Sequence, residues 1–444
     1  MNFPRALHIL TYDMAGTVVA TGRPKPCRHT DLVTHTHQLL VGLRARHPGI
    51  RWAITQTGAR QPGACQLRTP EGILVFAQGV RTGFTQYLVS ASGHGKDPDR
   101  VHHFYEDAVD NPANPVYGGL ARQYAHVIAT AAMRNVLAQN VNPLVSILKA
   151  EQFGRLRTAG VDRLAVTGVI HDLAGIDQRL DYVRRRLDLT EHSVQLVATS
   201  TAVTEHLLKA GIPRERVHMV PNGLDVAAFL ARLQDAAAHD VFSAVAQRNQ
   251  LPAGRMILMS AHRATWNGHL DLIEAARILA DRGSDAYIAI TGDGAHDGRA
   301  AKYTRDLFEA VAAYRLWDKV FLLDTLSPRE AAACARAAYA AVLPARDLEA
   351  FGYSSIEAML ARTPVVATAH GGALDYVDDG RSGLLVPPGA PQALAAALGR
   401  LLEDRGLHDR LARAGRASAA RFDLGVMAAG FADVIAGHAI GDRP

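Results

Sequence analysis

Short apolar runs alternate along the chain with longer segments in which apolar residues recur at helical spacing. Residues 31–46, for example, place Leu32, Leu39 and Leu43 on one helical face. The predicted strands are residues 6–12, 51–55, 72–77, 163–170, 194–200, 256–260, 286–291, 320–324 and 339–344. The predicted helices include residues 31–46, 116–140, 202–210, 270–280, 354–360, 390–404 and 407–422. This alternation through both halves predicts doubly wound α/β domains.

The length of the chain predicts two large domains, because 444 residues exceed what one ordinary hydrophobic core holds. Each domain is expected to be Rossmann-like, and the two are expected to face each other across a cleft. We expect the first domain at residues 1–235 and the second at residues 236–425, with a linker between about 229 and 252. A last helix is expected within residues 426–444.

One stretch of the second half has the chemistry of a binding site. The strand at 339–344 leads through a short loop to a helix that starts near Ser354, so Glu349 lies between strand and helix. Glu357 lies on the helix itself. The free N–H groups and positive dipole end of such a helix suit a phosphate. The two carboxylates are placed to accept hydrogen bonds from sugar hydroxyls, which together describes a nucleotide-sugar site.

The same stretch carries a resemblance to a known family. The pattern Glu349-x7-Glu357 contains Phe351 and Gly352, and two further segments follow it in the family's order, at 363–372 and 380–389. It resembles the signature of retaining GT-B glycosyltransferases of the family 4 type, also called glycosyl transferases group 1. A bare pair of glutamates at this spacing is common on a solvated helix face, so the order of the three segments carries the resemblance.

The resemblance implies an activity and a fold. The activity is transfer of a hexosyl group from a nucleoside diphosphate sugar to a hydroxyl acceptor, with retention of configuration and without a metal or other cofactor. The fold is GT-B, with acceptor binding in the first domain, donor binding in the second, and a final helix over 426–444 that crosses back to the first domain.

The resemblance also assigns residues. The catalytic set is His171, which approaches the transferred sugar, Arg263, which neutralises the diphosphate, and Glu349, which holds a sugar hydroxyl. Glu357 is assigned to the ribose hydroxyls, and backbone N–H groups of the helix start cradle the diphosphate. The donor-binding set is Gly16, Asn267, Phe351, Gly352, Tyr353, Ser354 and Glu357.

Two positions depart from the family pattern. The family has a lysine that grips the diphosphate where this chain has Asn267, so one positive charge is missing, and His269 or another basic group is expected to replace it. The family also has a Gly-Gly pair in the first loop of the chain, where this sequence has isolated glycines such as Gly16. These departures leave open which nucleotide and which sugar the site takes.

The cysteine content, the short motifs and the charge indicate which compartment and which partners to expect. Three scattered cysteines support neither a disulfide framework nor a metal site, and with no signal-like start they predict a cytoplasmic protein. Asp97-Pro-Asp99 has the letters of a metal-binding motif but lies in a charged turn, so no metal is expected. No nucleic-acid module is recognisable. The net charge of +5 is unevenly spread, with 25 Lys and Arg against 18 Asp and Glu in residues 1–230, a balance of +7, and a balance of −2 in the rest. A basic first half suits weak peripheral membrane contact or an anionic acceptor, although an ordinary solvated surface has the same composition.

Other functions on the same scaffold remain open at this point. A phosphorylase or disaccharide synthase would use a sugar phosphate or a free sugar, and the altered positions Arg263 and Asn267 are compatible with that. A catalytically inactive, sugar-nucleotide-binding homologue is a third possibility, against which the presence of His171, Arg263, Glu349 and Glu357 argues. The sequence does not indicate the acceptor or the oligomeric state.

Overall fold

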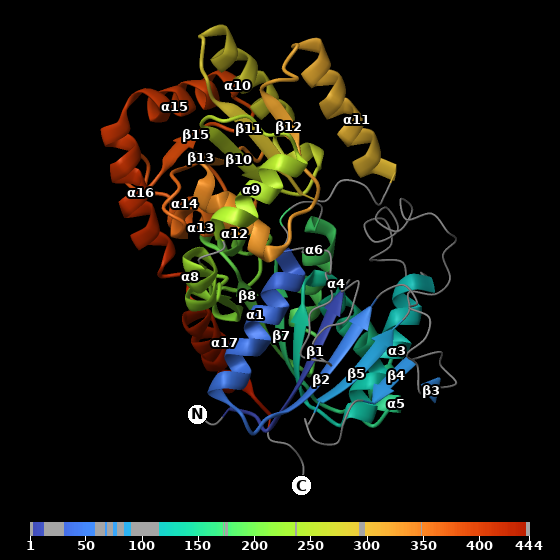
Figure 1. Cartoon of the computed structure of the whole chain (residues 1–444). Coiled ribbons are helices and arrows are strands. Elements are labelled where there is room, and N and C mark those ends of the chain that lie inside the picture. Colours follow the sequence, from blue (N-terminus) through green and yellow to red (C-terminus); the bar gives the residue numbers. More distant parts are fainter. Residues whose placement is uncertain are drawn as a thin grey trace. The chain divides into compact units, whose positions relative to one another are not determined.

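The computed structural model describes residues 3–12, 31–57, 67–68, 74–77, 84–89, 115–171, 173, 176–235, 238–292, 298–347 and 349–440 (Figure 1). The chain divides into two compact units. Unit 1 consists of Met1–Gly223 together with Leu424–Pro444, and unit 2 consists of Leu224–Asp423. Each unit is built around its own sheet.

The described part of unit 1 forms a nine-stranded sheet with the order β3-β4-β5-β2-β1-β6-β7-β8-β9. Pairing is parallel from β5 to β9 and antiparallel among β3, β4 and β5. The strands are β1 (Ala6–Tyr12), β2 (Arg51–Thr57), β3 (Leu67–Arg68), β4 (Leu74–Ala77), β5 (Phe84–Val89), β6 (Asn135–Gln139), β7 (Ala165–Ile170), β8 (Ser193–Ala198) and β9 (Val217–Met219).

Helices cover both faces of this sheet. They are α1 (Asp31–Arg46), α3 (Pro115–Ala131), α4 (Val141–Gln152), α5 (Arg155–Thr158), α6 (Asp177–Leu187), α7 (Thr201–Lys209) and α17 (Leu424–His438). Leu39 of α1 and Phe431 of α17 share one core with Ile9 and Val169 of the sheet. Gly168 points to the opposite face, where a Cβ would lie 2.9 Å from Leu144 of α4. A parallel sheet covered on both sides is the predicted doubly wound arrangement.

Unit 2 contains a six-stranded parallel sheet with the order β12-β11-β10-β13-β14-β15. Its strands are β10 (Met256–Ser260), β11 (Tyr287–Thr291), β12 (Val320–Leu322), β13 (Ala340–Leu343), β14 (Val365–Thr368) and β15 (Leu384–Val386). Its helices are α8 (Val226–Gln234), α9 (Ala238–Arg248), α10 (His269–Asp281), α11 (Gly298–Ala313), α12 (Pro328–Ala337), α13 (Tyr353–Leu360), α14 (Ala373–Tyr376), α15 (Pro391–Glu403) and α16 (Arg405–Ala419).

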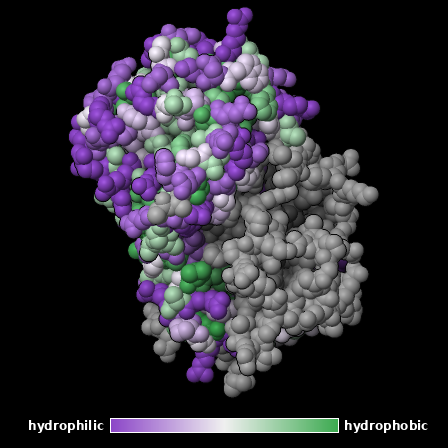
Figure 2. All heavy atoms as spheres, in the orientation of Figure 1, coloured by the Kyte–Doolittle hydropathy of each residue, from purple (hydrophilic) through white to green (hydrophobic). Residues whose placement is uncertain are grey.

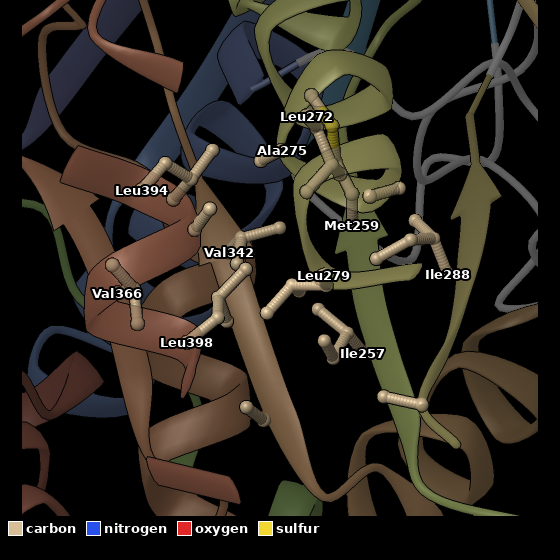
Figure 3. Close-up of a cluster of buried hydrophobic side chains, with 14 of the residues drawn as sticks. Ile257, Met259, Leu272, Ala275, Leu279, Ile288, Val342, Val366, Leu394 and Leu398 are labelled. Carbon is tan, nitrogen blue, oxygen red and sulfur yellow. The ribbon is translucent and has the colours of Figure 1, made fainter. Parts of the chain in front are cut away.

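The core of unit 2 lies on both faces of its sheet. On one face, Leu272 and Leu279 of α10 and Leu398 of α15 pack against Ile257 and Val342 of neighbouring strands (Figure 3). On the other, Ala341 packs with residues of α13, and Leu258 with residues of α12. Both faces of the central strands are therefore buried, which explains their uninterrupted apolar sequences.

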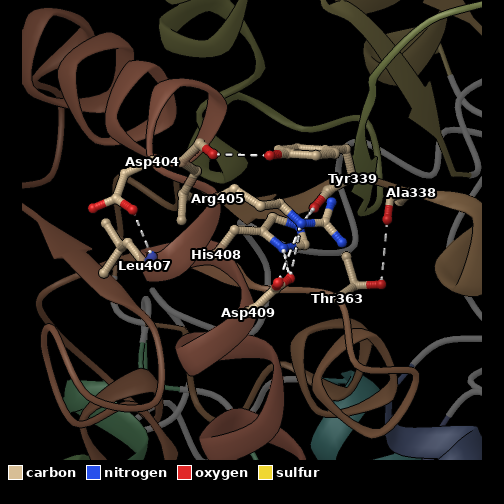
Figure 4. A network of polar contacts seen from close by, with 9 residues as sticks. Ala338, Tyr339, Thr363, Asp404, Arg405, Leu407, His408 and Asp409 are labelled. Atoms are coloured by element: carbon tan, nitrogen blue, oxygen red, sulfur yellow. Dashed lines mark hydrogen bonds and ion pairs between the residues drawn. The ribbon is translucent and has the colours of Figure 1, made fainter.

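Polar contacts fix the beginning of β13 (Figure 4). The His408 ring on α16 pairs through Nε2 with the Tyr339 carbonyl oxygen at 2.9 Å, and its Nδ1 lies 3.2 Å from Asp409. The Tyr339 hydroxyl donates to the Leu401 carbonyl oxygen at 3.0 Å. These contacts anchor the end of β13 opposite to the one that leads toward Glu349.

Two expectations about secondary structure were wrong. The single helix predicted at 116–140 is α3 followed by β6, because Ala132 turns the chain at a φ of 51° without a glycine or proline to mark it. The segment expected to be a linker, about 229–252, forms α8 and α9 instead. Phe229 and Leu233 are buried in the core of unit 2, so the compact units meet at Gly223 and Leu224 rather than at residue 235.

The surface of the described residues of unit 2 mixes polar and apolar side chains (Figure 2). A few large apolar side chains are exposed, among them Trp317 at 58% and Trp266 at 50%. Among the described helices, we find none whose length and apolar character would let it cross a membrane.

Candidate functional site

The start of α13 has the features expected of an anion-binding helix end. Gly352 is the N-cap residue with a φ of 91°, and no side chain caps the helix. A Cβ at Gly352 would lie 2.7 Å from the Tyr376 hydroxyl, so both the backbone conformation and the space favour glycine. The first N–H groups of the eight-residue helix are therefore not occupied by a capping side chain, and they point where a phosphate is favourable.

The loop after β14 holds the Glu349 segment in place by backbone contact. The Gly372 N–H donates to the Glu349 carbonyl oxygen at 2.8 Å. A Cβ on Gly372 would lie 2.5 Å from the Ala350 carbonyl oxygen, closer than a side chain tolerates. Gly371 and Gly372, which end the segment 363–372, therefore let two backbones touch, which fixes the position of Glu349.

Aromatic side chains pack against the segment between Glu349 and the start of α13. Phe351 and Tyr353 are buried, and their rings lie 5.0 Å apart. Phe351 also packs against Tyr376 and Phe422. Both were predicted as donor-binding residues; in the structure their rings form the core under the loop, so their side chains act by fixing the backbone of the helix start.

The two carboxylates occupy different environments. Glu349 Oε1 accepts a long hydrogen bond, 3.4 Å, from the Phe351 N–H. Glu357 lines a small cavity with Ser260, Thr291 and Ser354. Burial raises the pKa of Glu357 to about 7, and the charge of Arg232 opposes this only in part. Glu357 is thus a weakly solvated carboxyl that gains from a hydroxyl partner.

The turn between β10 and α10 carries the other predicted donor residues. Arg263 is buried, and its guanidinium donates to the Leu323 carbonyl oxygen. Asn267 Nδ2 donates to the His262 carbonyl oxygen at 2.7 Å. A Cβ on Gly268, whose φ is 74°, would lie 1.8 Å from the Pro344 carbonyl oxygen, so this turn lies directly against the end of β13.

The structure shows which basic group stands beside this turn. His269 is fully buried against Tyr303, and burial lowers its pKa to about 4, which argues against the expectation that it supplies the charge of the missing lysine. Arg346 does carry a charge there. Its backbone N–H donates to the Trp266 carbonyl oxygen at 2.7 Å, and its half-exposed side chain pairs with buried Asp271.

Sequence reasoning did not select Arg346. The sequence shows that Arg346 precedes Glu349 by three residues, but it does not show that its partner is Asp271, which lies 75 residues away on α10. The pairing depends on the contact between the two loops, which no local pattern encodes.

The remaining predicted residues belong to unit 1. His171 follows β7 and is buried, with Nε2 2.8 Å from Gln139 Oε1 and its ring centroid 4.3 Å from that of His35. Burial lowers the pKa of His171 to about 3. Gly16 and Asp97-Pro-Asp99 lie outside the described residues. Among the residues that are described, no three His, Cys, Asp or Glu side chains gather as a metal site requires.

Comparison with known proteins gives a family match in the second half of the chain and several relatives. Residues 243–418 match the family Glycosyl transferases group 1. A D-inositol 3-phosphate glycosyltransferase of Xylanimonas cellulosilytica is 32% identical over 244 residues, which are 54% of this chain and 56% of the relative. An alpha-D-kanosaminyltransferase of Streptomyces kanamyceticus is 32% identical over 232 residues, 52% of this chain and 56% of the relative. The chain thus aligns with little more than half the length of each.

Solved structures match nearly the whole chain. Anabaena Alr3699/HepE in complex with UDP-glucose has a TM-score of 0.67 at 16% identity, covering 97% of this chain and 99% of that one. The sucrose-phosphate synthase (tll1590) of Thermosynechococcus elongatus has a TM-score of 0.70 at 17% identity, covering 98% of both chains.

The two sheets and these comparisons identify the fold of the chain and the family of its second half. The two sheets and the full-length structural matches give the chain the GT-B fold, as predicted from its sequence. The part of the chain that contains α13 and the Glu349 segment belongs to glycosyl transferases group 1, which confirms the predicted family.

Proposed function

We propose that this protein is a retaining glycosyltransferase that moves a hexosyl group from a nucleoside diphosphate sugar to a hydroxyl acceptor. The observation that carries the proposal is the start of α13, where N–H groups without a capping side chain lie between Glu349 and Glu357. Such a helix end stabilises a diphosphate, and carboxylates on either side accept hydrogen bonds from sugar and ribose hydroxyls. The printed names of the relatives, which are glycosyltransferases, support the same activity.

Each residue of the site has a role in this proposal. The N–H groups of Tyr353 and Ser354 bind the diphosphate, and Arg263 and Arg346 provide positive charge near it. Glu357 holds the ribose hydroxyls, and Glu349 holds a hydroxyl of the transferred sugar. Fixed dipoles and cations, rather than water, then stabilise the negative charge that develops on the leaving diphosphate.

The acceptor is activated within the same arrangement. As the bond from the anomeric carbon to the diphosphate breaks, the departing phosphate oxygen takes the proton of the acceptor hydroxyl, and that hydroxyl oxygen bonds to the anomeric carbon on the same face. The protein contributes position and electrostatic stabilisation. His171 of unit 1 is proposed to contact the transferred sugar.

One observation favours a second candidate. Asn267 is turned inward to the His262 carbonyl oxygen, so the turn after β10 presents less positive charge than a lysine there would. The phosphate that leaves a sugar phosphate donor has one phosphoryl group and therefore less negative charge than a leaving nucleoside diphosphate. A phosphorylase or disaccharide synthase on this scaffold is therefore the alternative, and a binding homologue without activity is the third.

Binding and hydrolysis measurements separate these functions. Isothermal titration with UDP, GDP and ADP is expected to give one preferred nucleotide, and Glu357→Ala is expected to weaken its binding about tenfold or more, as loss of a charged hydrogen bond does. Glu309→Ala, an exposed change on α11, is the matched control and is expected to bind like the wild type. Turnover of a panel of sugar nucleotides, with the product anomer followed by NMR, then tests retention.

Each outcome of these measurements supports a different function. Nucleotide binding with turnover of a sugar nucleotide supports the proposal. Turnover of sugar phosphates alone supports the phosphorylase, and nucleotide binding without any turnover supports the inactive homologue. Equal nucleotide affinity in the wild type and Glu357→Ala would contradict the ribose assignment.

A further inference from the structure

Three polar residues lie together on the α1 face of the unit 1 sheet, at the carboxyl ends of its strands. Gln139 ends β6 and pairs in register with Val169 of β7, so the two side chains share a face. His171 follows two residues after Val169 and continues that face. His35 is on α1, which packs over it.

The contacts among the three are specific. His171 Nε2 lies 2.8 Å from Gln139 Oε1, in a buried hydrogen bond between side chains 32 residues apart in sequence. The His35 ring meets the His171 ring edge to face at 4.3 Å and also contacts Phe431 of α17. Among the described residues, the two buried nitrogens of His35 and the Gln139 amide nitrogen have no well-aligned hydrogen bond, although the Gln139 side chain is close enough to His35 to raise its pKa. The His171–Gln139 bond is therefore the fixed point of the group.

The bond decides where the proton of the His171 ring lies. With the Gln139 amide oriented as in the structure, its oxygen accepts and Nε2 donates, and a neutral imidazole then has its lone pair on Nδ1. The ring is neutral because burial lowers the pKa of His171 to about 3. His35 is neutral for the same reason, with its pKa lowered mainly by burial and further by His171, while Gln139 opposes the change.

The backbone next to Gln139 is held in an unusual conformation. Asn140 has a φ of 76° and a ψ of 169°, a region that residues other than glycine rarely enter. Its N–H donates to the Val169 carbonyl oxygen at 2.8 Å, and its Oδ1 accepts from the Val141 N–H at 2.7 Å. A strained turn that the surroundings hold in place is a feature of sites where the position of a side chain matters.

We propose that Gln139 is a positioning residue that fixes His171 as the Nε2-protonated, neutral imidazole, with Nδ1 as the acceptor for a substrate hydroxyl. His35 packs against the ring and keeps it in this orientation. The consequence for transfer rests on the proposed function, in which His171 contacts the sugar. The protonation pattern itself does not depend on that function.

Unit 1 contains a second contact between a histidine ring and a glutamine side chain. His218 Nε2 lies 2.9 Å from Gln195 Oε1 between β9 and β8. His218 and Gln195 lie outside the residues proposed to act in transfer. Gln195→Met is therefore the control for Gln139→Met, because both changes remove an acceptor from a histidine and retain side-chain length.

The test is ¹⁵N NMR of histidine-labelled protein, with the His171 signals assigned by their loss in His171→Gln. In the wild type we expect a pyrrole-like shift at Nε2 and a pyridine-like shift at Nδ1. Gln139→Met is expected to populate the other tautomer, and to lower kcat about tenfold, which corresponds to one ordinary hydrogen bond, without change in nucleotide affinity. Gln195→Met is expected to change only His218 signals and to leave kcat unaltered.

A conservative second variant guards against a failure of Gln139→Met to fold. Gln139→Glu keeps the shape and adds a carboxylate, which is expected to raise the pKa of His171 so that its signals titrate between about pH 5 and 7, unlike the wild type. A wild-type ring protonated on Nδ1, or His171 signals that no change at Gln139 affects, would overturn the proposal. If the wild type shows no transfer at all, the proposed function fails, while the NMR shifts still decide the tautomer.

Discussion

Replacing Glu357 with glutamine tests whether the carboxyl group of this residue on α13 is desolvated in the folded protein. Burial raises the pKa of Glu357 to about 7, above the ordinary value of 4.5. The charged form is therefore disfavoured in the folded protein. Stability from this residue is fully present below about pH 4.5 and is lost as the pH rises through 7. Glutamine has nearly the same shape and never ionises, so the penalty disappears in the variant.

The size of the effect follows from the two pKa values. The full difference corresponds to roughly 3 kcal/mol at about 1.4 kcal/mol per pH unit. The Glu357 side chain is partly accessible at the cavity, so solvent screening reduces the expected value to about 1–2 kcal/mol. Glu357→Gln is thus expected to be about 1–2 kcal/mol more stable relative to the wild type at pH 8 than at pH 5.

Urea unfolding of both proteins at several pH values between these limits measures the difference, with Glu309→Gln on α11 as an exposed control that should show no trend. Binding of the nucleotide provides a second reading, because the glutamine oxygen still accepts a hydroxyl hydrogen bond and should retain more affinity than alanine. A stability difference between wild type and Glu357→Gln that is constant across the pH range would refute the reasoning, since it would mean that the carboxyl is not desolvated.

Three further changes test the site. Gly372→Ala is expected to cost about 1–3 kcal/mol in thermal unfolding, because its Cβ would lie 2.5 Å from a backbone oxygen; Gly437→Ala, with open space around it, is the control and should not destabilise. Arg346→Ala is expected to cost about 1–2 kcal/mol, because it leaves the Asp271 side chain, 5% exposed, without its ion pair, and an equal cost in an Asp271→Asn background would show that the pair does not matter. Glu349→Gln is expected to lower kcat by about 10²–10³-fold with little change in nucleotide affinity, as removal of an interaction made in the transition state does; a selective loss of nucleotide affinity would reassign the residue.

Much of the fold could be predicted because its signals are local. The helix at 31–46 and the strand at 256–260 were predicted with the bounds that the structure gives. The pattern Ser327-x-x-Glu330 is typical of a capping box, and in the structure the Ser327 hydroxyl and the Glu330 carboxylate each accept from the other residue's backbone N–H. Strand β6 was missed because the turn before it uses Ala132, which carries no turn signal.

In the site too, local features could be predicted and contacts between residues distant in sequence could not. The helix start at Tyr353 was predicted to within one residue, since a strand, a glycine and an apolar helical stretch follow in order. The pairs Arg346–Asp271 and His171–Gln139 could not be predicted. Each joins residues that only strand order and loop contact bring together, and Gln139 lies in the strand that the sequence pattern failed to mark.

A crystal structure of the protein with the nucleotide that titration selects tests the central claim most directly. The account predicts the diphosphate within hydrogen-bond distance of the Tyr353 and Ser354 N–H groups, and the ribose hydroxyls on the Glu357 carboxyl. A nucleotide bound away from the start of α13, or a ribose that makes no contact with Glu357, would contradict it.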